Sequence, residues 1–261
     1  MSNLSYIILF SLIGGVFSLV GGMILLWKES LARKLSIYLI SFAGGALLGA
    51  AFLELIPESL EAGAALSIES STVIIFVLLG FLIAFLIEGL LLQIHHHVND
   101  HHAGHEHDHG ALDTRPWLLL IGDSIHNFVD GFAITAAFLA SVPLGIATSL
   151  VVAAHEIPQE IGDFSIMIHA GWKKWRIAFW NIASALLTTV GALAAYSARD
   201  FLEPYIAYIL AGTAGLFIFI AASDILPEFG HASHFEKRWR ITPVFFTGIL
   251  LIWILGKYLA E

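Results

Sequence analysis

Cysteine is absent from the 261 residues, which excludes disulfide bonds and thiolate metal ligands and leaves nitrogen and oxygen donors for any metal site. Charge is also scarce: charged residues make up 13% of the chain, and only 12 residues are lysine or arginine. A basic surface for nucleic acid is therefore excluded. The hydrophobic fraction of 58% and the mean hydropathy of +0.84 exclude an ordinary soluble globular protein.

Hydropathy predicts about eight spans of roughly 20 residues, each long enough to cross a hydrocarbon core of about 30 Å. They lie near residues 6–27, 36–57, 72–94, 117–141, 143–169, 177–198, 205–227 and 241–259. The turns between them are short, so residues 1–261 are expected to form a single transmembrane domain, an all-α membrane protein. The first span has no basic residue before it and no small-residue cleavage site, which predicts a retained helix rather than a signal peptide.

The distribution of basic residues predicts the orientation of these spans. The loops after spans 1, 3, 5 and 7 hold ten of the twelve lysines and arginines, and the other side holds Arg199 and Lys257. Loops rich in lysine and arginine stay on the cytoplasmic side. Both termini are therefore expected outside, with the odd-numbered loops in the cytoplasm.

Two short segments suggest an internal repeat. Glu54-Leu-Ile-Pro-Glu58 closes the second span, and Asp224-Ile-Leu-Pro-Glu228 closes the seventh. The two spans run in opposite directions, as in an inverted repeat that relates spans 1–3 to spans 6–8 around a central pair. The alternative is chance, because helix ends often carry proline and glutamate. If the repeat holds, Glu58 and Glu228 mark the outer and inner mouths of one pathway, with Asp224 beside the inner one.

The fourth span carries a polar stripe inside an otherwise apolar segment. Asp123, His126, Asn127 and Asp130 are spaced so that all four share one side of a helix. Such a stripe is expected to face a partner helix rather than lipid.

The fifth span carries a second group of the same kind. His155, Gln159 and Asp163 form one stripe, and Glu156 and Glu160 lie beside it. A charged side chain at mid-bilayer costs about 2.5–3.5 kcal/mol, so such residues indicate function. Imidazole, carboxylate and amide donors together suit a divalent ion such as Zn²⁺. The alternative is a polar clamp between helices that holds no ion.

Between the third and fourth spans, at about residues 95–115, lies a segment without apolar periodicity, expected to be a cytoplasmic loop. It contains eight histidines within residues 95–109, a composition typical of a disordered metal-binding tract. The alternative is a polar spacer. The histidines are His95, His96, His97, His101, His102, His105, His107 and His109.

With these motifs the chain resembles the ZIP (Zrt-, Irt-like) family of divalent-metal transporters over nearly its whole length. The resemblance rests on His-Asn-x-x-Asp-Gly in the fourth span, His-Glu-x-Pro-x-Glu-x-Gly-Asp in the fifth, and the position of the histidine-rich loop. The fifth-span motif is similar to that of the LIV-1-type subfamily. The resemblance implies eight spans in a 3+2+3 arrangement, a homodimer, and movement of the central helices against the rest. The short chain indicates a bacterial protein of the inner membrane.

The resemblance also implies a mid-membrane site for one or two transported ions and no cofactor. The primary ligands would be His126, Asp130, His155 and Gln159. Asn127, Asp130 and Glu156 would form a second position, and Glu54 would be a further metal-facing residue. Gln159 departs from the family, which usually has histidine or glutamate there. This departure is expected to weaken a second position and to shift selectivity from Zn²⁺ toward Fe²⁺, Mn²⁺ or Cd²⁺.

Two other classes of function stay open at this point. His155-Glu156-Ile157-Pro158-Gln159 nearly matches the H-E-x-x-H motif of zinc hydrolases, but the second histidine is missing and Pro158 distorts the turn. A metal sensor or exporter is the other alternative. A carrier that imports divalent ions, rather than an enzyme, is the expected function.

Overall fold

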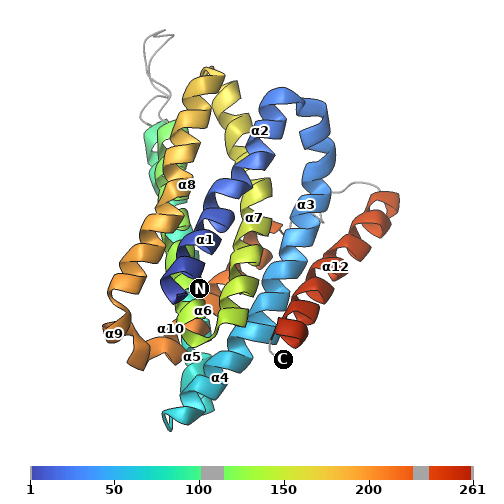
Figure 1. Ribbon diagram of the computed structural model, residues 1–261. Coiled ribbons are helices and arrows are strands. Elements are labelled where there is room, and N and C mark those ends of the chain that lie inside the picture. The colour runs from blue at the N-terminus through green and yellow to red at the C-terminus, as the bar shows by residue number, and fades with distance from the viewer. Residues whose placement is uncertain (1, 101–114, 226–234, 260–261) are drawn as a thin grey trace.

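The computed structural model describes residues 2–100, 115–225 and 235–259, and in these ranges the chain forms an all-α bundle without strands (Figure 1). The elements in chain order are α1 Asn3–Gly15, η1 Val16–Leu19, α2 Val20–Trp27, α3 Glu29–Gly49, η2 Ala50–Leu55, α4 Ile56–Ala65, α5 Ser70–Asp100, α6 Arg115–Ala140, α7 Val142–His169, α8 Lys174–Ser197, α9 Arg199–Leu202, η3 Glu203–Tyr205, α10 Ile206–Ile220, η4 Ala221–Ile225 and α12 Phe235–Leu259.

Six helical runs in the described ranges are long and apolar enough to cross a membrane. They are Asn3–Trp27, Glu29–Ala65, Ser70–Gly89, Lys174–Ser197, Arg199–Ser223 and Trp239–Tyr258. Helices α6 and α7 have 26 and 28 residues, which also exceed the roughly 20 that a bilayer requires. They are not among the six apolar runs because they carry the polar motifs. The protein is an all-α, multi-pass integral membrane protein.

Helix α7 lies at the centre of the bundle, where it packs against α1, α2, α3 and α6 (Figure 1). Its buried positions extend from Leu144 to Met167, almost its full length. Helices α5 and α12 instead expose large apolar side chains such as Leu78, Phe85 and Phe246. The polar motifs of α6 and α7 are thus shielded from lipid, while the peripheral helices present the apolar surface that lipid requires.

The packing of α3 against α12 reproduces the packing of α10 against α5. A Cβ atom at Gly45 of α3 would overlap the carbonyl oxygen of Phe245 in α12, and a Cβ at Gly215 of α10 would overlap that of Val77 in α5. Glycine allows this close approach of two backbones in a membrane. Since Gly45 and Gly215 precede the two similar acidic segments by the same distance, these contacts are those expected of the inverted repeat.

Each of these repeat helices also loosens into a π-helix at the same relative place, at η2 Ala50–Leu55 and η4 Ala221–Ile225. Pro57 follows η2 and cannot donate a hydrogen bond to the carbonyl of Leu53, which an α-helix would require. A π-turn is one way for the backbone to accommodate this loss. Proline was visible in both segments, but its effect on the helix type was not predicted.

Helices α6 and α7 are joined by Ser141 alone. Its backbone is extended, and its hydroxyl oxygen accepts a hydrogen bond from the N–H of Leu144 at 3.3 Å, which caps α7. Pro143 in the first turn has no N–H that would need a partner. Before α6 in the chain, α5 extends to Asp100, so the first residues of the expected 95–115 loop are helical.

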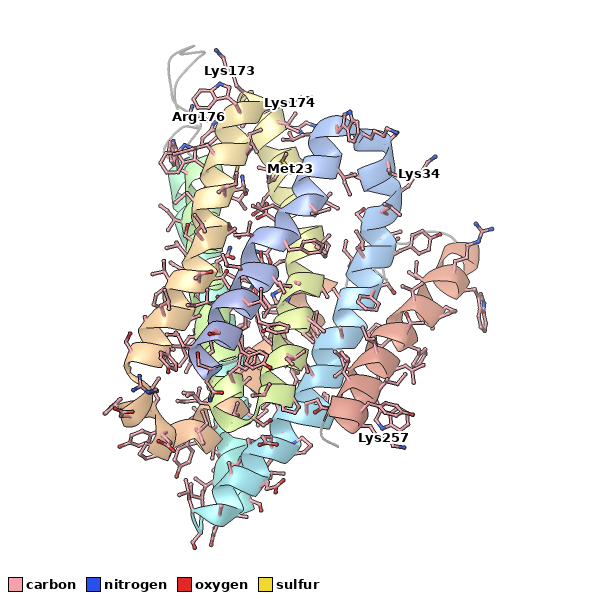
Figure 2. The ribbon with its side chains drawn as sticks, viewed as in Figure 1. Met23, Lys34, Lys173, Lys174, Arg176 and Lys257 are labelled. Carbon is pink, nitrogen blue, oxygen red and sulfur yellow. The ribbon has the colours of Figure 1, made fainter. Side chains whose placement is uncertain are left out.

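Basic side chains gather at one end of the bundle. Lys34, Lys173, Lys174 and Arg176 lie at the upper end in Figure 2, and Lys257 lies at the lower end. At the upper end the ammonium group of Lys174 donates to the backbone oxygen of Leu26 at 2.7 Å. We call the upper end the basic end.

Candidate metal centre

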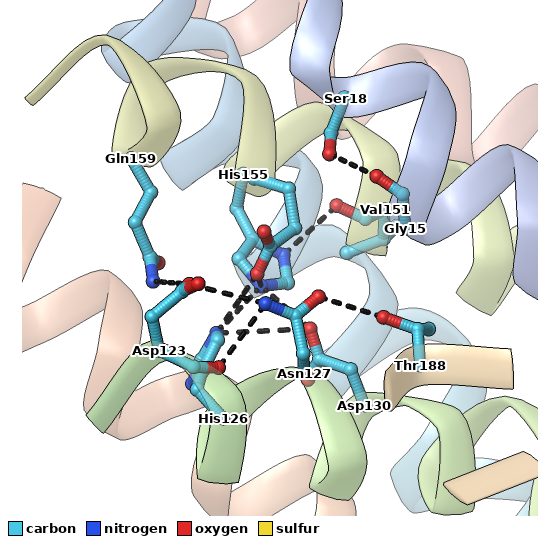
Figure 3. A network of polar contacts seen from close by, with 11 residues as sticks. Gly15, Ser18, Asp123, His126, Asn127, Asp130, Val151, His155, Gln159 and Thr188 are labelled. Atoms are coloured by element: carbon cyan, nitrogen blue, oxygen red, sulfur yellow. Dashed lines mark hydrogen bonds and ion pairs between the residues drawn. The ribbon is translucent and has the colours of Figure 1, made fainter. Parts of the chain in front are cut away.

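Four side chains from α6 and α7 bring their ligand atoms within 4.8 Å of one another: His126, Asp130, His155 and Glu156. We call this group the four-ligand cluster (Figure 3). His126 and Asp130 lie one turn apart on α6, so both reach the same side of that helix. Asp130 and Glu156 are fully buried, His155 is 2% exposed and His126 is 22% exposed.

The nitrogens and oxygens of the four-ligand cluster converge on one small volume. Nε2 of His126 lies 3.2 Å from Nε2 of His155 and 3.4 Å from Oε1 of Glu156. Nε2 of His155 lies 3.1 Å from Oδ2 of Asp130 and 3.9 Å from Oε1 of Glu156. Two imidazole nitrogens and two carboxylates are a donor set that suits Zn²⁺ and similar divalent ions.

The orientation of His155 is fixed from within its own helix. Its Nδ1 lies 3.0 Å from the carbonyl oxygen of Val151, which can only accept a hydrogen bond. Nδ1 therefore carries the proton, and Nε2 presents a lone pair to the cluster. A histidine that binds a metal usually has its other nitrogen held in this way. Phe217 of α10 lies edge-on to the ring at 6.1 Å between centroids and excludes water from that side.

The carboxylates of the cluster have no hydrogen-bond donors of their own. Both oxygens of Asp130 and both oxygens of Glu156 are buried without a hydrogen-bond partner. Nε2 of His155 faces Oδ2 of Asp130 and Nε2 of His126 faces Oε1 of Glu156, so two imidazole nitrogens and two carboxylates share one buried volume. Buried carboxylates without partners are costly, and a cation between them removes that cost. The arrangement therefore offers a cation the ligands that these carboxylates require.

The two amide side chains of the motifs bind to Asp123. Nδ2 of Asn127 donates to Oδ1 and to the backbone oxygen of Asp123, both at 3.1 Å, and Nε2 of Gln159 donates to Oδ1 at 3.4 Å. Oδ1 of Asn127 accepts from the hydroxyl of Thr188 in α8 at 2.7 Å. The amide of Asn127 thus supports the site instead of offering a free oxygen to it (Figure 3).

The other expected residues lie apart from the cluster. A Cβ at Gly256 of α12 would overlap the carboxylate of Glu54, which therefore faces that helix. Glu58 lies in α4. The side chains of Asp224, Glu228 and the histidines of residues 95–109 fall outside the part of the chain whose side chains the structure describes.

A cavity of about 490 Å³ reaches the cluster from the basic end. Its lining includes His126, His155, Gln159 and Asp163, and it continues to Glu88 on α5. On the opposite side of the cluster the bundle is filled by an apolar core that includes Phe138, Leu144, Val151 and Phe217. The cavity thus adjoins one side of the cluster, and the apolar core adjoins the other.

Three contributors to this site were not predicted: the carbonyl of Val151, Phe217 and Thr188. The first two carry no signal, because a backbone oxygen and an apolar ring look ordinary in any membrane helix. Thr188 had one. It follows Asn181 and Ser184 at helical spacing, and all three are buried on one side of α8, which packs against α6.

Comparison with known proteins identifies relatives of this chain. The family described as ZIP Zinc transporter matches residues 3–114 and 95–256. The chain is 35% identical to human zinc transporter ZIP10 over 143 residues, which are 55% of this chain and 17% of the human protein. It is 39% identical to mouse zinc transporter ZIP4 over 142 residues, which are 54% of this chain and 21% of the mouse protein.

Zinc transporter ZIP4 of rat is 31% identical over 274 aligned residues, which cover 83% of this chain and 41% of the rat protein. The chain thus spans less than half the length of these curated relatives. The match of the family over nearly all of the sequence, together with the paired motifs on α6 and α7, shows that the chain belongs to the ZIP zinc transporter family.

Proposed function

We propose that the protein is a carrier that imports divalent transition-metal ions, Zn²⁺ first among them, into the cytoplasm through the four-ligand cluster. The observation that carries this proposal is the convergence of two imidazole nitrogens and two buried carboxylates without hydrogen-bond donors. A divalent ion cannot enter hydrocarbon with its water shell, so fixed ligands must replace that shell. These ligands also have to release the ion, which the adjoining cavity permits.

The charge distribution gives the orientation of the bundle in the membrane. The basic end would be cytoplasmic because lysine and arginine accumulate on that side of membrane proteins. Both ends of the chain would then lie outside. The cavity at the basic end makes this an inward-facing state, in which the apolar core blocks the outer route. Import requires a second state in which that core opens.

The number and kind of ions follow from the donor set. The four-ligand cluster would hold one ion, with Gln159 as a further oxygen donor from the cavity wall. Since Asn127 is bonded to Asp123 and Thr188, a second ion beside the first would require that amide to turn. Fe²⁺, Mn²⁺ and Cd²⁺ accept the same donors and are the expected competitors.

For the partners and location we propose a homodimer in a bacterial inner membrane. The apolar faces of α5 and α12 are available for a second copy or for lipid. The histidine-rich segment at residues 95–109 would bind ions that leave the cavity. Its deletion is expected to preserve transport and to change its regulation.

Flux of radioactive zinc into proteoliposomes tests the carrier function. Saturable uptake is expected for the wild type and loss of uptake for His155→Ala. His169→Ala is the matched control, because His169 lies exposed at the end of the same helix and outside the cluster. Binding without flux in the wild type would instead indicate a sensor, and outward flux alone would indicate an exporter.

A zinc hydrolase is the second candidate because of His155-Glu156. In a hydrolase the glutamate acts as a general base on a metal-bound water. Here Oε1 of Glu156 lies among the ligand atoms of the cluster, 3.4 Å from Nε2 of His126, which favours a ligand role. Glu156→Gln should therefore weaken uptake in proportion to metal binding, whereas peptide hydrolysis by the wild type would support the enzyme.

A further inference from the structure

Three further acids lie inside the bundle between the four-ligand cluster and the basic end. Asp123 is 4% exposed, Glu160 is 1% exposed and Asp163 is 6% exposed. On α7, Glu160 and Asp163 follow Glu156 by four and seven residues, which places them about 6 and 10 Å further along the helix axis. Helix α6 runs in the opposite direction, so Asp123, three residues before His126, lies on the same side of the cluster.

Two of these acids have buried oxygens without the partners that a structural role would supply. Both oxygens of Glu160 and Oδ2 of Asp123 are buried without a hydrogen-bond partner. Oδ1 of Asp123 accepts from Asn127 and Gln159, so this acid is held in place by the two amides. An acid that only joined two helices would be expected to bind a donor, and an unsatisfied buried carboxylate is costly.

The electrostatic surroundings of Glu160 make this cost larger. The strongest charged neighbours of its carboxylate are Asp123 and Asp163, which have the same sign. Asp163 also lines the cavity beside Gln159, so the group has access to ions from that side. Like charges that converge beside a cavity, with unsatisfied oxygens, are the surroundings in which a divalent cation is stabilised.

We propose that Asp123, Glu160 and Asp163 form a second binding position for the transported divalent cation, one that uses oxygen ligands alone. It rests on the proposed carrier function and adds a station between the four-ligand cluster and the cavity. Among the described residues, only the four-ligand cluster already has its ligand atoms within 4.8 Å of one another. The three acids are spaced more widely, so they close around the ion when it arrives.

An all-oxygen station explains how an ion could leave a site that contains two imidazoles. Zn²⁺ prefers nitrogen donors, and carboxylates alone hold it less tightly and exchange it more readily. Moving an ion from the four-ligand cluster to this position therefore weakens its binding in steps before it reaches the cavity. Binding to the two positions is sequential, so the second one controls release more than capture.

Cadmium NMR on the purified full-length protein in detergent tests the proposal, because the resonance of bound Cd²⁺ depends on whether nitrogen or only oxygen is coordinated. Two resonances are expected for the wild type. The double variant Glu160→Gln and Asp163→Asn should lose the oxygen-only resonance and keep the other. His155→Ala should do the reverse. Asp200→Asn with Glu203→Gln, two exposed acids, is the matched control and should keep both.

The result decides the proposal separately from the carrier function. Cadmium affinity at the oxygen-only position should fall about tenfold or more in the double variant, and zinc uptake should slow severalfold with little change in half-saturation. A wild type with one resonance, or a double variant with both, would overturn the second position. If the double variant does not fold, Glu160→Gln alone must still weaken the oxygen-only resonance. Absence of uptake in a wild type with two resonances would overturn transport alone.

Discussion

Helix α6 supplies the four-ligand cluster with His126 and Asp130, the first and fifth residues of its motif. Helix α7 supplies His155 and Glu156, the first and second residues of its own motif. A shift of 29 positions aligns the two motifs. The aligned pairs are His126 with His155, Asn127 with Glu156, and Asp130 with Gln159. Each helix thus carries one imidazole, one acid and one amide, but the acid and the amide have exchanged places.

This exchange gives aligned positions of two similar helices different roles. The acids Asp130 and Glu156 both face the imidazoles, and the amides Asn127 and Gln159 both donate to Asp123. The acids therefore reach the imidazoles from different positions of the two motifs, while the amides reach Asp123 from the remaining ones. An inverted repeat can therefore keep its backbone symmetry while its ligand set becomes asymmetric.

The largest expected effect comes from removing an acid on the α6 side. Asp130→Ala should lower zinc uptake by about a hundredfold or more, since a ligand loss exceeds the 10–100-fold typical of supporting residues. Uptake is measured in proteoliposomes with equal amounts of inserted protein. Gln159→Ala, the aligned change on α7, should have a much smaller effect. Equal losses in the two variants would contradict the exchange of roles.

The next effect concerns the residue that follows each motif. A Cβ at Gly131 of α6 would overlap the carbonyl oxygen of Thr188, whereas the aligned position on α7 holds the full side chain of Glu160. Gly131→Ala should lower the free energy of unfolding by about 1–3 kcal/mol because the backbones of α6 and α8 must separate.

Thermal unfolding in detergent measures this change. Gly162→Ala is the matched control, because no atom lies within 4 Å of its added Cβ. The control should stay within about 0.5 kcal/mol of the wild type. Similar losses in both variants would mean that helix propensity, rather than close packing of α6 against α8, determines the result.

A smaller effect is expected from Thr188→Val, which keeps the shape of the side chain and removes the donor to Asn127. Zinc affinity should fall about tenfold, as for other residues that orient metal-site groups. Isothermal titration measures it. Thr213→Val is the control, because that hydroxyl donates to Ile209 of its own helix. An unchanged affinity would show that Asn127 does not depend on Thr188.

The smallest expected effect is a change of selectivity. Gln159→His adds an imidazole one turn from His155 and should raise the preference for Zn²⁺ over Mn²⁺ by a few-fold, because nitrogen donors favour Zn²⁺. Gln159→Glu should shift the preference in the opposite direction. Competition between the two ions during uptake measures both changes. A common shift in both variants would indicate that charge or volume, and not donor type, controls selectivity.

The sequence was sufficient to predict the all-α membrane class, because apolar spans of about 20 residues have few other solutions. It also predicted that the polar groups of the fourth and fifth spans lie together, since costly polar groups at helical spacing are expected to face one another. His126, Asp130, His155 and Glu156 were all among the expected ligands, and the structure brings them together.

The finer geometry depended on contacts between helices that the sequence does not display. Asn127 could donate to a metal through its oxygen, and only the position of Thr188 on α8 decides that this oxygen is occupied. Glu54 lies within the π-helix η2, which changes the angular position of its residues, and its carboxylate faces Gly256 of α12. A hydropathy pattern contains neither the rotation of a helix nor its departure from α geometry.

The single-residue connection at Ser141 has a consequence for how such a carrier can evolve. One residue spans at most about 3.8 Å between neighbouring Cα atoms, so α6 and α7 have almost no slack between them. We expect them to move together as one hairpin in any rearrangement, so that the four-ligand cluster keeps its shape while its surroundings change. Substitutions in α6 and α7 could then change the preference for one ion over another without changes in the helices that surround the hairpin.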